Sequence, residues 1–161
     1  MSTLPVPDHS TLQSWLNQFE IEYFMCGSCE GLHLPMLQDH PMIYDAKVEI
    51  EGDFVYLTSS IELKPTGLMQ AFAELSRLNS HYPTLKIFIE MTDDSLPRLI
   101  IAHNLALLPG IAIEQFEFFV RDCVDQMQQL ANEVAKLQIN FVEDGIEEIE
   151  IETVPAPMMM H

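Results

Sequence analysis

The sequence predicts an α+β domain in which an antiparallel β-sheet packs against three helices, in the order α-β-β-β-α-β-β-α. Segments with the two-residue alternation of strands occur in pairs joined by short turns, and helical patterns separate these pairs. The chain has 161 residues and is 48% hydrophobic, which suits a single core. We therefore predict one domain over residues 1–142 and an acidic, mostly mobile tail over residues 143–161.

The first predicted element is a helix over residues 9–21. Either Asp8 or Ser10 can cap its N-terminus with a side-chain oxygen. The apolar side chains that share one face of this helix are Leu12, Trp15, Leu16 and Phe19.

The stretch FMCGSCEGLHLP, residues 24–35, predicts a hairpin that turns at Gly27 and Ser28, because glycine supplies the positive φ of a tight turn. In this register Cys26 faces Cys29, and Phe24 faces Gly31. The side chains that point toward the core are then Ile21, Tyr23, Met25, Leu32 and Leu34.

A second hairpin follows, with its turn at Gly52 and Asp53. Both of its strands agree with one register, in which the polar residues lie on the opposite face. The residues on the apolar face are Tyr44, Ala46, Val48, Ile50, Val55, Leu57 and Ile61.

The predicted middle helix, residues 65–80, begins at Pro65 and is apolar around much of its circumference. A surface helix that packs on one core needs a single apolar stripe. We therefore expect this helix to contact a second protein body, and we predict a homodimer or partner surface at Leu68, Met69, Phe72 and Leu75.

Two more strands, residues 84–91 and 97–108, are joined through residues 92–96. The second strand is apolar on both faces, which predicts a central or interfacial position. A last helix is predicted over residues 113–139. Its buried seam alternates spacings of four and three and consists of Phe116, Val120, Cys123, Met127, Leu130, Val134 and Leu137.

Charge limits the function classes. Seven basic residues against 25 acidic ones give a formal charge of −18. Such a surface repels phosphate backbones and anionic lipids, so we expect neither nucleic-acid nor membrane partners. The N-terminus lacks the features of a secretory signal, and we expect a cytoplasmic protein with reduced cysteines.

Cys26 and Cys29 are the main candidates for chemistry, and three interpretations are open. A redox dithiol of this spacing works at a helix N-terminus, whereas the residues here follow a strand pattern. A zinc site would need further ligands. In a regular strand His33 lies ~13 Å from Cys29, at ~3.3 Å per residue, and His9 and His40 are conceivable alternatives. The third interpretation, a turn flanked by two thiols, is favoured.

We therefore predict no catalytic residue, no cofactor and no metal, and we keep a thiol or zinc protein that uses Cys26 and Cys29 as the alternative function. Glycine-rich phosphate loops and nucleophile motifs are absent from the sequence. Cys123 lies in the seam of the last helix, where a buried thiol behaves as a small apolar residue.

Several stretches resemble the YbjN family of bacterial proteins, described as sensory transduction regulators. They are CGSCEGLHLPMLQ, YDAKVEI, ELSRLNS and FIEMTDDSLPRLIIAHNLALLPGIAIEQFEFFVR, and the likeness covers roughly residues 5–140. The resemblance implies a fold like that of class I type III secretion chaperones and an acidic protomer that dimerises. It also implies a non-enzymatic role, exerted through protein–protein contacts, in stress response, motility and surface-polysaccharide regulation.

Overall fold

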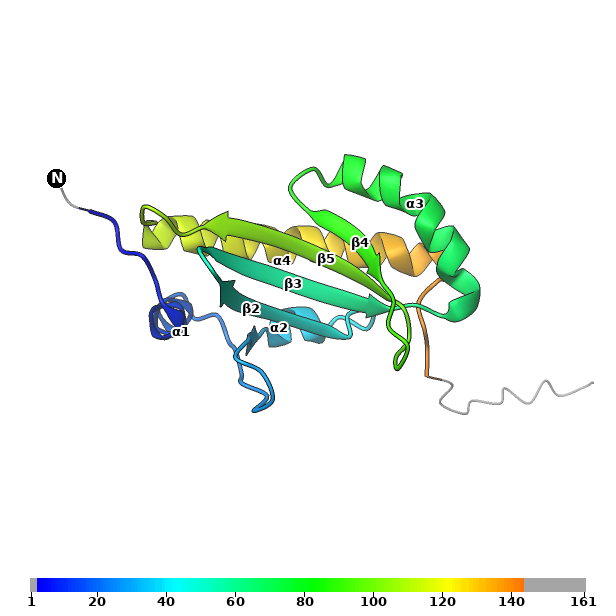
Figure 1. Cartoon of the computed structure of the whole chain (residues 1–161), viewed down its shortest axis with the longest axis horizontal. Helices are drawn as coiled ribbons and strands as arrows, with labels where there is room; N and C mark the ends of the chain where they lie inside the picture. Colours follow the sequence, from blue (N-terminus) through cyan, green and yellow to red (C-terminus); the bar gives the residue numbers. More distant parts are fainter. Residues whose placement is uncertain (1–2, 144–161) are drawn as a thin grey trace, which may run out of the picture.

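A computed structural model of the chain describes residues 3–143 and has the predicted α+β class (Figure 1). Its five strands form one sheet in the order β1-β2-β3-β5-β4, and every neighbouring pair is antiparallel. The elements are α1 (His9–Gln18), β1 (Leu32–His33), α2 (Pro35–Gln38), β2 (Asp45–Glu51), β3 (Phe54–Glu62), the 3₁₀ helix η1 (Pro65–Gly67), α3 (Leu68–His81), β4 (Lys86–Glu90), β5 (Arg98–Ala106) and α4 (Ile113–Leu137).

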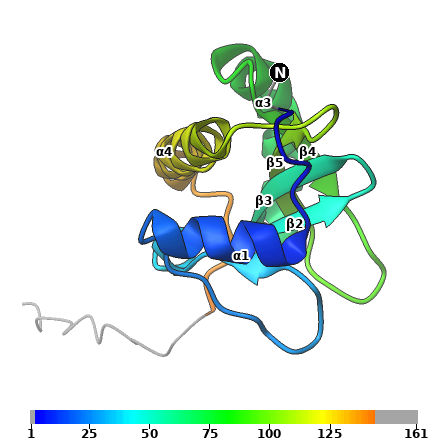
Figure 2. The same ribbon diagram turned by 90° about the vertical axis from the view of Figure 1, so that its left-hand side faces the viewer.

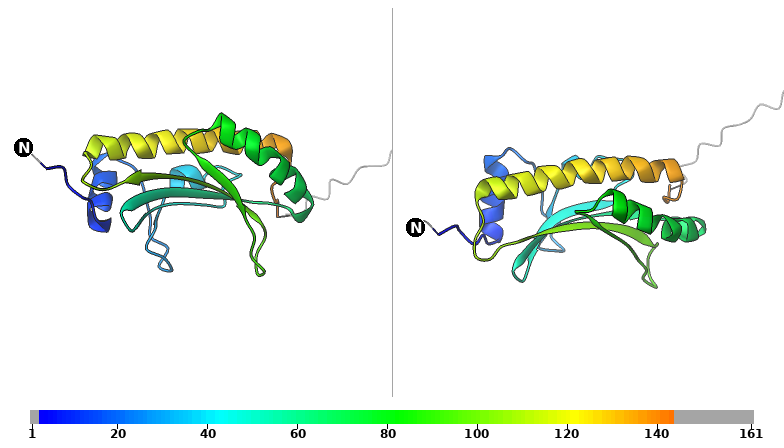
Figure 3. Two further views of the ribbon diagram at one scale, coloured as in Figure 1. Left: turned by 45° about the horizontal axis from the view of Figure 1, so that its top comes forward. Right: turned by 90° about the horizontal axis from the view of Figure 1, so that it is seen from above.

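The helices leave one face of the sheet uncovered. Helix α4 runs along the opposite face, and α1 crosses that face at one end, as Figure 2 and Figure 3 show. The core lies between this face and α4, where six of the seven predicted seam residues of α4 are buried and Leu137 is partly buried. No helix within residues 3–143 is long and apolar enough to cross a membrane.

The predicted second hairpin is confirmed. Glu51 pairs with Phe54 across Gly52 and Asp53, and Gly52 has a φ of 58°. Its apolar face is buried or packed against the core, with one exception: Tyr44 precedes β2 and is exposed. Strand β5 lies between β3 and β4, so the strand that is apolar on both faces is central.

The predicted first hairpin is wrong in its register. Phe24 pairs with His33, and not with Gly31, so a connection over residues 25–31 replaces the predicted two-residue turn. Gly27 has the expected positive φ, 79°. Met25, predicted to point inward, is exposed. The reason is that β1 takes its register from β2, where Leu32 pairs with Val48.

Residues 3–143 contain four α-helices instead of the three predicted. The additional helix, α2, is a single turn that begins at Pro35, a residue favoured at a first helical position, and buries Leu37. The predicted middle helix divides into η1 and α3.

Asn79 of α3 covers part of the outer edge of the sheet at β4. Its side chain donates a hydrogen bond to Ile87 O (2.9 Å) and accepts one from Ile87 N (3.0 Å). Both backbone polar groups of Ile87 are thereby satisfied by one side chain. This part of the edge is closed to another strand.

Candidate functional site

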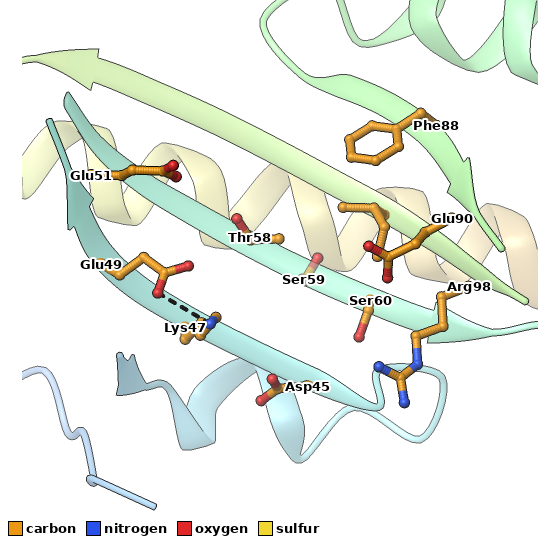
Figure 4. Close-up of a pocket in the computed structure, with 11 residues that line it drawn as sticks. Asp45, Lys47, Glu49, Glu51, Thr58, Ser59, Ser60, Phe88, Glu90 and Arg98 are labelled. Atoms are coloured by element: carbon orange, nitrogen blue, oxygen red, sulfur yellow. Dashed lines mark hydrogen bonds and ion pairs between the residues drawn. The ribbon is translucent and has the colours of Figure 1, made fainter. Parts of the chain in front are cut away.

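The uncovered face of the sheet forms a shallow depression with a volume of about 470 Å³ (Figure 4). Thr58 and Ser60 of β3 lie at its centre, between charged residues of β2 on one side and Phe88 and Glu90 of β4 on the other. Acidic side chains outnumber basic ones among the residues that line the depression. The acidic residues are Asp45, Glu49, Glu51 and Glu90, and the basic residues are Lys47 and Arg98. The depression is therefore an acidic surface with no deep, enclosed cavity.

Arg98, one of the two cations of this face, contacts two side chains. Its guanidinium lies over the Tyr44 ring, 4.6 Å from the centroid, and 3.6 Å from Glu62. Lys47 forms an ion pair with Glu49 at 3.1 Å. These contacts hold both cations against the sheet.

The surface predicted on the middle helix is only partly exposed. Leu68 and Leu75 pack against the core of the same chain, whereas Met69 and Phe72 are 80% and 45% exposed. Ala73 is exposed beside them. Two of the four predicted side chains therefore remain available to a partner.

Cys26, Cys29 and His33 come together, contrary to the predicted separation of Cys29 and His33. The Sγ atoms of the two cysteines are 3.3 Å apart, and Cys29 Sγ is 3.2 Å from His33 Nε2. A non-strand connection between residues 25 and 31 folds back over His33, so the estimate from regular strand spacing does not apply. Within residues 3–143 this is the one group of three or more cysteine, histidine or acidic side chains close enough to share a metal ion.

His33 is held in place from several sides. The residue is 6% exposed, and its ring stacks on Phe24 with centroids 5.1 Å apart. Nδ1 lies 2.8 Å from Asp45 Oδ1, and the same carboxylate oxygen accepts a hydrogen bond from Gln38 Nε2 at 2.7 Å. Sequence reasoning missed Asp45, because only the pairing of His33 with Lys47 brings these residues together.

The two thiols differ in acidity. Hydrogen bonds from Ser28, and then from Cys29, lower the pKa of Cys26 to about 6. The hydrogen bond with Cys26 raises the pKa of Cys29, because it favours the thiolate on its neighbour. Cys26 is exposed and Cys29 is partly buried.

The other histidines proposed as ligands lie in different places. Both ring nitrogens of His40 are engaged elsewhere, with Asn132 Oδ1 at 2.9 Å and the backbone N–H of Met42 at 3.2 Å. His9 lies nearer the cluster and contacts the carbonyl of Glu30 at 2.8 Å. The structure therefore removes His40 from the candidate ligands.

Comparison with known proteins gives consistent matches. The sequence model of the YbjN family, described as "Putative bacterial sensory transduction regulator", matches residues 8–136. The chain is 32% identical over 139 residues to the uncharacterized proteins YbjN of Escherichia coli (strain K12) and Shigella flexneri, which covers 86% of this chain and 88% of each relative. The crystal structure of Escherichia coli YbjN, described as a "putative transcription regulator", matches with a TM-score of 0.83 over 86% of this chain and 99% of that chain, at 32% identity.

Proposed function

Since the chain belongs to the YbjN family, we propose that it is a regulator that acts by binding proteins, including a second copy of itself, and not by catalysing a reaction. The processes that it controls in this proposal are stress response, motility and surface polysaccharide, as the resemblance to the family implies. The observation that carries the proposal is the second apolar stripe of α3.

Helix α3 has two stripes on different faces. Ala71 and Leu78 are buried, and Leu68 and Leu75 pack beside them on the core. The outward apolar stripe has the spacing i, i+3, i+4 and consists of Met69, Phe72 and Ala73, all exposed. A helix that packs on one core alone needs only the first stripe.

Further exposed apolar residues lie in β4 and just after it. Strand β4 follows α3, and the two elements are packed together. Phe88 is 36% exposed and Met91, just after the strand, is 61% exposed. A stable homodimer buries roughly 800 Å² per partner, so the helix needs such additions.

The closed edge of β4 favours contact through side chains of α3 over sheet extension. Because Asn79 occupies both backbone groups of Ile87, a partner strand would have to displace this side chain first. The proposed dimer therefore packs helix against helix.

Sedimentation velocity of the full chain at micromolar concentrations tests the dimer. We expect a dimer for the natural sequence. The double substitution Met69→Glu, Phe72→Glu should shift it to monomer, with the dissociation constant raised roughly 30-fold or more, because two charges are placed in the interface. Circular dichroism checks that the variant is folded, which exposed positions should allow.

Phe118→Glu is the matched control. Phe118 is an apolar residue of α4 that is 71% exposed, and α4 begins at the other end of the molecule from α3 (Figure 1). It should leave the dimer unchanged. A chain that stays monomeric throughout this concentration range, or a dimer that survives the double substitution, contradicts the proposed surface.

A further inference from the structure

The connection between Phe24 and Leu32 collects three atoms that commonly ligate metals. Cys26 Sγ, Cys29 Sγ and His33 Nε2 all lie within 4.8 Å of one another. A tetrahedral ion bound at 2.0–2.3 Å requires ligand atoms roughly 3.3–3.8 Å apart. The distance between the two Sγ atoms, 3.3 Å, and the distance between Cys29 Sγ and His33 Nε2, 3.2 Å, are close to this requirement.

Glycine makes this path of the chain possible. Gly27, between the cysteines, has a φ of 79°, in the left-handed region that disfavours other residues. Gly31 lies directly against Lys47, where an added Cβ would be 2.7 Å from the lysine Cδ. The connection can therefore turn tightly and approach β2 closely enough to place Cys29 beside His33.

The surroundings of His33 provide a second, independent observation. Asp45 accepts a hydrogen bond from Nδ1, so that the lone pair of Nε2 points toward Cys29. A carboxylate on the far nitrogen is the usual partner of a metal-binding histidine, because it fixes the tautomer and the ring orientation. Gln38 in turn holds Asp45, and Phe24 covers the ring. Together these contacts fix the ring with Nε2 directed at Cys29.

We propose that Cys26, Cys29 and His33 bind one zinc ion, with Asp45 as a positioning residue. A donor set of two thiolates and one imidazole favours zinc over the other common divalent cations. With both cysteines ionised, the site is neutral once the ion is bound. Exposure of Cys26 gives the ion a path from solvent and leaves a fourth position open to a further ligand. The site is separate from the outward stripe of α3, so it does not depend on the proposed dimer.

The test uses the full chain without an affinity tag, reduced, freed of metal by a chelator and then transferred to chelator-free buffer under argon. Zinc is titrated in competition with a chromophoric chelator. We expect one ion per chain, and we expect cobalt(II) in the same site to give the sulfur-to-cobalt charge-transfer band and the strong visible bands of a tetrahedral complex. Zinc should also raise the melting temperature, because it binds the folded state.

Four variants locate the site. Each of three single substitutions should abolish stoichiometric zinc binding: Cys26→Ser, Cys29→Ser and His33→Gln. With cobalt(II), each should also lose the charge-transfer band or the visible bands of the tetrahedral complex. Asp45→Asn should keep the tetrahedral spectrum of cobalt and weaken zinc affinity roughly 10- to 100-fold, the usual effect of losing a partner of a metal ligand.

Cys123→Ala and His9→Gln are the controls. Cys123 is buried in α4, and His9 lies next to the cluster without belonging to it. Both variants should bind zinc like the natural chain. The proposal is overturned if the reduced protein, with its thiols verified by titration, leaves all zinc with the chelator. Zinc binding that persists in the Cys26→Ser, Cys29→Ser double variant also overturns the proposal, because it would assign the ion to other residues. The same holds if the two thiols oxidise to a disulfide and the chain, once reduced again, still takes up no zinc.

Discussion

The three cysteine thiols of this protein are chemically identical, but packing gives them different exposure and different acidity. Cys26 is exposed and Cys29 is partly buried, whereas Cys123 lies in the seam of α4 and is completely buried. Burial raises the pKa of the Cys123 thiol far above its usual range, because the thiolate would lose its hydration. Cys123 is therefore chemically inert while the protein is folded.

Thiol titration tests this difference. The reduced, metal-free native protein should expose two thiols to Ellman's reagent, and the third should react only in denaturant. Cys123→Ala supplies the reference, with two reactive thiols in both conditions. Three fast thiols in the native protein would show that α4 does not shield this position.

Gly110 is a residue at which the backbone itself requires glycine. Its φ is 140°, and an added Cβ would lie 2.3 Å from the carbonyl oxygen of Leu4. Next to it, Ile111 N donates to Pro5 O at 3.0 Å, which ties the N-terminal segment to the start of α4. A side chain here would separate these two segments.

Gly110→Ala should lower the free energy of unfolding by about 3 kcal/mol or more, because backbone strain adds to the clash. Gly52→Ala is the matched control: its φ is also positive, but nothing lies within 4 Å of the added Cβ, so the cost should be about 1–2 kcal/mol. Urea unfolding followed by the fluorescence of Trp15, the single tryptophan, measures both. Equal losses in the free energy of unfolding for the two variants would mean that the close approach of Leu4 does not contribute to the cost.

At the scale of elements, the junction of α3 and β4 depends on one polar side chain. Asn79→Ala removes its bonds to Ile87 and leaves both backbone groups without a partner. We expect a loss of about 1–3 kcal/mol in the free energy of unfolding and self-association through the newly opened edge of β4.

Asn132→Ala is the corresponding control, because Asn132 is exposed and its side chain hydrogen-bonds to the His40 side chain, not to a backbone group of a strand edge. Its effect should stay within about 0.5 kcal/mol. Chemical denaturation and light scattering measure stability and association. If the two variants behave alike, the edge is closed by something other than Asn79.

The elements also show where sequence patterns fail. The second hairpin and α4 could be predicted, because long apolar repeats fix the face of each element. The first hairpin could not. Residues 21–26 alternate like a strand, yet only Phe24 makes a strand-like pair, with His33. The pairing of β1 with β2 sets the register of this region, and the local sequence pattern does not predict that pairing.

For the whole molecule, the formal charge of −18 dominates the response to solution conditions. Like charges repel most in the compact state, and salt screens them with a Debye length of about 10 Å at 0.1 M. The melting temperature should therefore rise as sodium chloride increases from low to moderate concentration. Circular dichroism melts, with sucrose as an uncharged reference, measure the shift. A melting temperature that falls with salt would mean that attractive ion pairs outweigh the repulsion.

Local composition and periodicity were enough to predict the α+β class, the second hairpin, the apolar excess of α3 and the seam of α4. Each of these depends on residues within a few positions of one another, so the chain carries the signal directly. Contacts between distant segments needed the folded chain: Asp45 behind His33, Leu4 over Gly110 and Asn79 on Ile87. The cluster at Cys26, Cys29 and His33 belongs to this second group, because an irregular connection and the register of β1 on β2 together set its distances.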